Sequence, residues 1–327
     1  MKFNKILYSF ALLGFSAVLT FSSCKKKEDP KTEPTVETPD GQSGTDSREV
    51  QGENDAAVND INDIIGNSSL AGRSEASSGT AGVTGNICGL TVDSNGTDLA
   101  NQIIKFTYTG VTCNNRTRTG SIKLTLQGGS TAKWKTPGAK IKIEYIGYKI
   151  TRASDQKSIK FDGIQELTNV SGGTWWELII TKTKSSLVGT ITGTNLKVTF
   201  EDNKTATYNI NRKVTYTYPN SILTVTAEGI GSSGSTNNLE NYGTARNGDV
   251  FTSQVSTPVV WNATCGGAVL QGVVSVNDIT QNINLKFSYG VDTNGNPQTV
   301  GPNACPYGWK LEWTANATTN SKVFGYY

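Results

Sequence analysis

The chain has 327 residues, with 30 basic and 27 acidic side chains, five cysteines and no histidine. Without histidine, catalytic triads and dyads that use an imidazole base are excluded, as are zinc sites with histidine ligands. The formal net charge of +3 is too small for the clustered basic surface of a nucleic-acid-binding protein. The length allows one large β domain or two ordinary ones.

Residues 1–23 have the features of a secretory signal peptide, with Lys2 and Lys5 ahead of the apolar run FALLGFSAVLTF. That run is too short to cross a bilayer as a finished helix. It ends in the sequence FSSC at Cys24, which resembles the lipobox of bacterial lipoprotein signal peptides. The resemblance implies cleavage before Cys24 and acylation of its thiol and new amino group, which would anchor the chain in a membrane without spanning it. An ordinary signal peptide with a chance cysteine is the alternative.

The segment after Cys24 is predicted to be a lipid-anchored, disordered tether covering residues 24–53. It is rich in Pro, Glu, Thr, Gly and Ser, so it has little apolar surface to offset the entropy of ordering. Its first residues, KKKED, resemble the charged leader that favours display on the outer face of the cell, although three lysines precede the two acids. A solvated stalk beside lipid headgroups explains the same charges.

Residues 54–66 (NDAAVNDINDIIG) predict one short amphipathic helix, because their apolar side chains recur at helical spacing and Gly66 follows the last of them. The apolar stripe would dock on the main domain or bind a partner. The stripe consists of Ala57, Val58, Ile61, Ile64 and Ile65. Residues 67–82 are rich in Ser, Gly and Ala and are expected to be a linker.

From residue 83 onward the apolar period changes to two, which predicts an all-β fold: an antiparallel sandwich or a long curved sheet. Two parts of this region resemble each other. IKFTY at 104–108 matches LKFSY at 285–289, and SIKLTL at 121–126 matches GWKLEW at 308–313. The repeat predicts two related β lobes, 83–200 and 201–327. If the similarity arose by chance, 83–327 forms one domain.

Four cysteines remain after lipidation, and an even number in an oxidising compartment indicates disulfides. Each copy of the repeat begins with Cys-Gly and has a second cysteine between its matched strands. Of the three connectivities, the repeat therefore selects Cys88–Cys113 and Cys265–Cys305. Ligation of a metal by these cysteines is the competing interpretation, but the chain has no CxxC pair, so no metal site is predicted.

Paired carboxylates are the catalytic option that needs no histidine, since two acids suffice for glycoside hydrolysis. Candidates on strand-like segments are Glu144, Asp162, Glu166 and Glu177. A solvated sheet face or cross-strand ion pairs explain them equally well, so no catalytic residue is predicted.

Two loops, at 93–98 and 292–296, space oxygen ligands as calcium sites do, but Asn-Gly hairpin turns account for both. We therefore expect no cofactor.

The six tryptophans include one adjacent pair, Trp175 and Trp176. In a strand, neighbouring side chains face opposite sides, so at least one of the two would be exposed. The pair is therefore the candidate site for stacking on a ligand such as a sugar. Packing in the core is the expected role of the other four.

Several of these motifs together resemble an uncharacterised family of surface lipoproteins from Bacteroidota. They are the lipobox, the Lys/acid leader, the helix NDAAVNDINDIIG, and Cys-bounded strands that include NRTRTGSI at 115–122. The resemblance implies an all-β lipoprotein of the outer membrane, lipid-anchored and facing the cell exterior. It implies no reaction and no catalytic residue.

The sequence therefore predicts a non-enzymatic, surface-displayed module with a binding or structural role at the cell envelope. Its expected partners are the membrane, through acylated Cys24, and an extracellular glycan or protein, but no nucleic acid. A glycan-active hydrolase with paired carboxylates and a fimbrilin-like assembly subunit are the alternatives.

Overall fold

The computed structural model describes residues 42–71, 87–266, 268–298, 305–315 and 317–326. The predicted signal peptide, Cys24 and most of the predicted 67–82 linker lie outside the described residues. Among the described helices, none is both long enough and apolar enough to cross a membrane.

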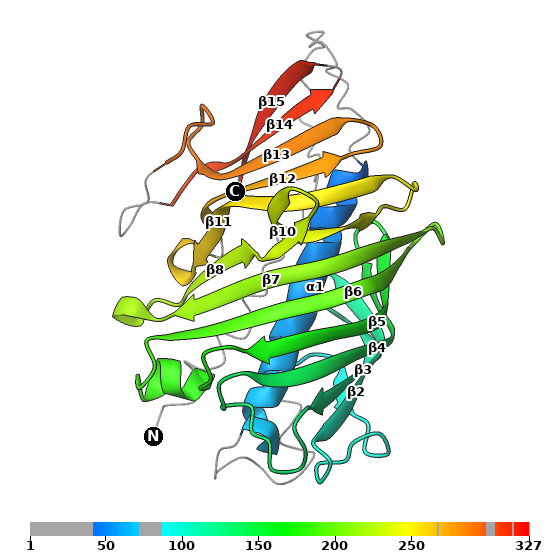
Figure 1. Cartoon of the computed structure of the whole chain (residues 1–327), viewed down its shortest axis with the longest axis vertical. Helices are drawn as coiled ribbons and strands as arrows, with labels where there is room; N and C mark the ends of the chain where they lie inside the picture. Colours follow the sequence, from blue (N-terminus) through cyan, green and yellow to red (C-terminus); the bar gives the residue numbers. More distant parts are fainter. Residues whose placement is uncertain (1–41, 72–86, 267, 299–304, 316, 327) are drawn as a thin grey trace.

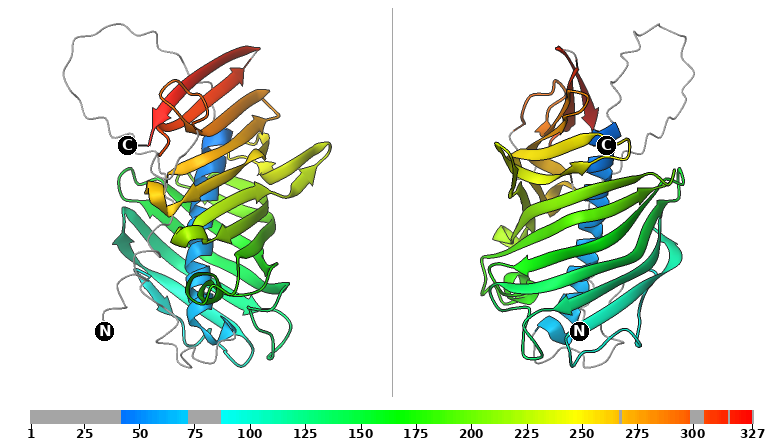
Figure 2. Two further views of the ribbon diagram at one scale, coloured as in Figure 1. Left: turned by 90° about the vertical axis from the view of Figure 1, so that its left-hand side faces the viewer. Right: turned by 45° about the vertical axis from the view of Figure 1, so that its right-hand side comes forward.

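One long helix lies against the concave side of a single antiparallel sheet (Figure 1). The helix is α1 (Gln42–Asn67), and the sheet curves around it, as both views in Figure 2 show. Of the two predicted β architectures, the long curved sheet is the one that forms. Its strands are β1 (Leu90–Val92), β2 (Ile103–Cys113), β3 (Arg116–Leu126), β4 (Ala139–Arg152), β5 (Ser158–Asn169), β6 (Ser186–Phe200), β7 (Thr205–Thr217), β8 (Thr224–Gly229), β9 (Gly231–Ser233), β10 (Thr236–Thr244), β11 (Val250–Asn262), β12 (Val269–Asp278), β13 (Ile283–Val291), β14 (Gly308–Ala315) and β15 (Thr318–Gly325).

The strand order follows the chain from β1 to β7, then continues with β10 to β15. Strand β8 pairs with both β7 and β11, and β9 pairs with β10, so these two short strands lie off the main path. Four short helical turns complete the described structure: η1 (Ser69–Ala71), η3 (Trp176–Ile180), η4 (Pro219–Ser221) and η5 (Ala263–Cys265).

Alternation along each strand places the apolar side chains on the concave face. On β3, for example, Ile122 and Leu124 are fully buried, whereas Lys123 between them is half-buried and points outward. The register sets Leu124 between Ile104 of β2 and Ile143 of β4, so the inward side chains form continuous cross-strand rows. The main apolar core includes residues of α1 and of strands from β1 to β14, and two smaller clusters contain Val274 and Cys265.

The lobe boundary expected near residue 200 falls in the turn between β6 and β7. These two strands pair along almost their whole length, from Ser186 opposite Thr217 to Thr199 opposite Thr205. The main core contains Phe106 from one side of the boundary and Phe287 from the other. The described part of 83–327 is therefore one continuous sheet with a shared core, without a division at this point.

Helix α1 begins at Gln42, well before the expected residue 54, so the predicted disordered tether is wrong for residues 42–53. The prediction was based on the low apolar content of this stretch. It is wrong because the polar side chains form hydrogen bonds and ion pairs with the sheet, which order them. Ser43 Oγ donates to Asp278 at 2.7 Å, Ser47 Oγ donates to Asn241 at 2.9 Å, and all four residues are buried. The predicted apolar stripe of the second half, from Ala57 to Ile65, is buried in the core as expected.

Six ion pairs, from Asp46 to Asp60 of the helix, join α1 to the sheet and its turns. In five of them the helix supplies the acid, and a strand or a turn of the sheet supplies an arginine. The pairs are Asp46–Arg246 (2.6 Å), Arg48–Glu240 (2.7 Å), Glu49–Arg152 (3.1 Å), Glu53–Arg116 (2.8 Å), Asp55–Arg212 (2.6 Å) and Asp60–Arg118 (2.6 Å). Burial raises the pKa of the Asp46, Asp55 and Asp60 carboxyls above their ordinary value, although each has an arginine partner that acts in the opposite direction.

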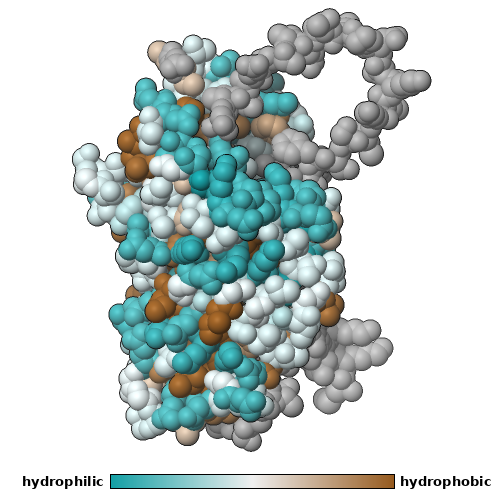
Figure 3. All heavy atoms as spheres, turned by 90° about the vertical axis from the view of Figure 1, so that its right-hand side faces the viewer, coloured by the Kyte–Doolittle hydropathy of each residue, from teal (hydrophilic) through white to brown (hydrophobic). Residues whose placement is uncertain are grey.

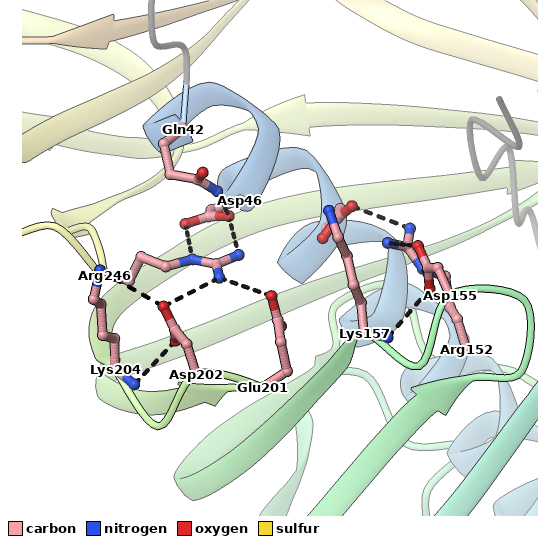
Figure 4. A network of polar contacts seen from close by, with 10 residues as sticks. Gln42, Asp46, Arg152, Asp155, Lys157, Glu201, Asp202, Lys204 and Arg246 are labelled. Atoms are coloured by element: carbon pink, nitrogen blue, oxygen red, sulfur yellow. Dashed lines mark hydrogen bonds and ion pairs between the residues drawn. The ribbon is translucent and has the colours of Figure 1, made fainter.

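The pair at the start of the helix is shown in Figure 4. Arg246 makes a two-point contact with the buried carboxylate of Asp46, with N–O distances of 2.6 and 2.7 Å, and also donates to Glu201 at 3.1 Å. Its guanidinium lies 3.7 Å from the centre of the Phe200 ring. Bidentate geometry and ring stacking suit arginine and would not suit lysine.

Both predicted disulfides are present. Cys88 is bonded to Cys113 at the end of β2, and Cys265, in the turn η5, is bonded to Cys305. The repeat-based choice among the three connectivities is therefore confirmed.

Replacing Arg246 by alanine should destabilise the protein by about 3–5 kcal/mol, because the Asp46 carboxylate would stay buried without its counter-charge. The measurement is chemical unfolding followed by circular dichroism. Lys160→Ala is the matched control, since Lys160 pairs with Asp162 on the outer face, where loss of an ion pair costs at most about 1 kcal/mol. Equal effects of the two substitutions would contradict a structural role for the buried pair.

Candidate functional site

A small cavity of about 50 Å³ lies between the second half of α1 and strands β5, β6 and β7. Three helix residues spaced four apart, Val58, Asn62 and Gly66, form its helix side. The sheet side is mostly aliphatic, and three aromatic residues, Trp134, Trp175 and Tyr216, complete the lining. A concave, mostly apolar recess with a few polar groups is the usual form of a binding site.

The segment between β5 and β6, residues 170–185, forms one wall of this cavity. It turns sharply at Gly172, where φ is +64° and a Cβ atom would lie 2.7 Å from the carbonyl oxygen of Lys135, so glycine is required there. The Gly173 amide donates to the same carbonyl at 2.7 Å, and the buried Asn169 side chain donates to the carbonyls of Trp134 and Gly173. These bonds fix the segment against the neighbouring loop.

Trp175 and Trp176 are at the start of the helical turn η3, so the strand geometry expected for this pair is wrong. The two side chains nevertheless separate as predicted. Trp175 is half-buried, lines the cavity and makes an edge-to-face contact with Tyr216 at 4.7 Å between ring centres. Trp176 has 39% of its surface exposed. Successive side chains of a π-helical turn project in different directions around its axis, which is enough to give the rings different surroundings.

A carboxylate lies near the cavity on the same stretch of helix. Asp63 follows the cavity residue Asn62. Burial raises the pKa of Tyr216 above its ordinary value, and the charges of Asp55 and Asp63 raise it further. Burial, reinforced by the nearby Asp60, raises the pKa of Asp63 to about 6. A carboxyl with a pKa this close to neutrality is typical of functional sites, and also of buried ion-pair networks.

The four carboxylates considered for glycoside hydrolysis are not among the residues that line the cavity. Glu144 contacts Lys123 and Lys142, Asp162 contacts Lys160, and Glu166 contacts Lys140. Glu177 is in the 170–185 segment, where it accepts a hydrogen bond from Thr174 at 3.0 Å. The Lys123–Glu144 and Lys140–Glu166 contacts are cross-strand ion pairs, as the alternative interpretation predicts. Lys142–Glu144 and Lys160–Asp162 are pairs along a single strand, and Glu177 is bonded within its own turn.

In each of the two calcium-like loops, the first aspartate accepts hydrogen bonds from backbone amides of the same loop. Asp93 accepts hydrogen bonds from the backbone amides of Asn95 and Gly96, and Asp292 accepts from those of Asn294 and Asn296. This is the ordinary Asx-turn arrangement. Across the described ranges, no group of three or more acidic or cysteine side chains is placed to hold a metal ion.

Sequence reasoning found Trp175 but missed its partners Val58, Asn62, Tyr216 and Trp134. They come from three separate parts of the chain, and only the curvature of the sheet brings them together. The helical spacing of Val58, Asn62 and Gly66 was the one feature of the sequence that could have indicated these cavity residues. The same spacing is equally typical of a helix stripe that packs on the core.

No protein-family model, curated protein or solved structure matches this chain. A proposed function must therefore be argued from the geometry of the site.

The raised pKa of Asp63 predicts how stability depends on pH. The unfolded carboxyl titrates near 3.8 and the folded one near 6, so this group lowers stability progressively from pH 4 to 6 and fully above pH 7. Asp63→Asn should therefore stabilise the protein by about 1–2 kcal/mol at pH 8 and have little effect below pH 4. Thermal unfolding at both pH values tests this; a variant that is less stable at pH 8 would contradict it.

Proposed function

We propose that this protein is a surface-displayed, lipid-anchored β protein with a non-enzymatic binding role at the cell envelope, and that the Trp175 cavity is its ligand site. The observation that carries the proposal is the recess itself, in which Trp175, Tyr216 and Trp134 surround one side of α1. The lipid anchor rests on the lipobox-like sequence at Cys24, and the export and display rest on the same N-terminal motifs.

The size of the recess limits what can enter it. The enclosed space of about 50 Å³ suits a small apolar group, so a larger ligand would lie partly outside the recess. The methyl of an N-acetyl group or of a 6-deoxy sugar fits this description. The sugar ring would then lie across the aromatic rim, with Asn62 available to bond an amide or hydroxyl group.

The positions and contacts of the acidic residues favour a binding role without catalysis. Glu144, Asp162 and Glu166 each contact a lysine on the outer face of the sheet, away from the aromatic recess. A glycosidase needs one carboxylic acid and one carboxylate on either side of the scissile bond. The cavity lining contains neither Asp nor Glu.

The test is retention of N-acetylated and 6-deoxy glycans on an array, with released reducing ends measured in the same samples. Trp175→Ala should weaken retention at least tenfold, since it removes one aromatic wall of the recess. Trp176→Ala, whose ring is outside the lining, should bind as the wild type does. Release of reducing sugar would overturn the non-enzymatic assignment, and equal binding by both variants and wild type would overturn the site.

A further inference from the structure

The 170–185 segment also presents apolar side chains to solvent. Val170, Trp176 and Ile180 are 46%, 39% and 42% exposed, so three of the ten exposed large apolar residues in the described structure belong to this one segment. Trp176 and Ile180 are four residues apart on η3, so they lie on the same side of that turn. In Figure 1 the turn projects from the end of the sheet beside β6 and β7.

The inward side of the turn is packed against the rest of the protein, which keeps Trp176 and Ile180 on the outward side. Leu178, between them in sequence, is 2% exposed, and Trp175 packs against Tyr216. The Thr181 amide closes the turn by donating to the Trp176 carbonyl at 3.0 Å. The apolar surface is thus a fixed feature of a rigid turn.

Three lysines belong to this segment or to the loop bonded to it. Lys182 and Lys184 belong to the same segment, and Lys135 lies across the Gly173 hydrogen bond that joins the two loops. Lys182 lies 5.9 Å from the ring centre of Tyr218, which keeps it beside the turn. The one acid of the segment, Glu177, is bonded to Thr174. The surroundings of the apolar turn are therefore net positive.

We propose that the turn around Trp176 and Ile180, with Lys135 and Lys182, is a membrane-contact site that inserts into the interface of an anionic lipid surface. Tryptophan favours the interface between headgroups and acyl chains, where its ring is half buried and half hydrated. Lysines around it are attracted to lipid phosphates. A membrane fits better than a protein partner, because exposed apolar side chains on one turn, with three lysines on this segment and the loop bonded to it, match the apolar interior and the anionic headgroups of a lipid interface.

This contact would act together with the lipid anchor. A protein with a single weak membrane-binding group attaches to the membrane only marginally, whereas two such groups together give stable attachment. The anchor would hold the chain near the membrane, and the turn would fix which face of the sheet is turned toward it. The inference does not depend on the glycan site, because it uses Trp176 and the outward side of the segment, whereas the glycan site uses Trp175.

Two exposed apolar residues of the outer sheet face have different surroundings. Ile146 and Ile164, 49% and 51% exposed, are on the outer face of β4 and β5 among ion-paired side chains. The face seen in Figure 3 is mostly hydrophilic, with hydrophobic patches separated by hydrophilic ones. Ile146 therefore provides a matched control of similar exposure.

The experiment uses the chain from residue 24 onward with Cys24→Ser, which removes the acylation site and leaves the rest of the mature chain unchanged. Vesicles of phosphatidylcholine with 30% phosphatidylglycerol are compared with pure phosphatidylcholine by co-sedimentation. Quenching of tryptophan fluorescence by brominated lipid reports insertion. We expect binding to the anionic vesicles only, weakening as salt rises.

Trp176→Ser combined with Ile180→Ser should weaken binding at least tenfold and remove the part of the quenching that depends on insertion. Lys135→Gln combined with Lys182→Gln should weaken binding and reduce its salt dependence. Ile146→Ser should change neither, and circular dichroism confirms that each variant is folded. No binding to anionic vesicles, or binding that is unaffected by the Trp176/Ile180 variant, overturns the proposal. Self-association or protein binding lost in that variant, without vesicle binding, would assign the turn to a protein partner and also overturn it.

Discussion

The structure depends on the pairing of an acidic helix with an arginine-bearing sheet. Helix α1 has few apolar residues in its first half, so burying it requires partners for its carboxylates, and Arg116, Arg152, Arg212 and Arg246 supply them. Buried ion pairs add little net stability over an apolar contact, but an unpaired buried charge is very costly. The pairs therefore restrict the helix to one position and one register against the sheet.

That fixed position creates the recess beside Trp175. Because α1 cannot slide or rotate, Val58, Asn62 and Gly66 stay opposite β6 and β7 at a spacing that the adjoining loop does not completely fill. The 170–185 segment completes the recess with Trp175 on one side and presents Trp176 on the other. One short turn thus has an inward surface suited to a small apolar group and an outward surface suited to lipid.

The internal repeat predicted the disulfides correctly but did not predict the strand register. It selected the correct disulfides, and its matched strands are β2–β3 and β13–β14, which lie toward opposite ends of the sheet. The pairing within the copies differs, however. Phe106 is opposite Ile122 in the first copy, whereas Phe287 is opposite Leu311, two residues beyond the matching Trp309. A shift of two keeps every side chain on its own face, so it is invisible to an argument from alternation.

The sequence by itself determined the all-β class, the inward faces of the strands, the second half of α1 and the two disulfides, because each follows from local periodicity or from cysteine order. Only the tertiary structure decided that residues 42–53 are helical, because their order comes from sheet arginines about 60 to 200 positions away in the chain. The same holds for the recess and for which of Trp175 and Trp176 faces it. Each depends on where distant segments meet, and contacts at long range leave no periodic signal in the local sequence.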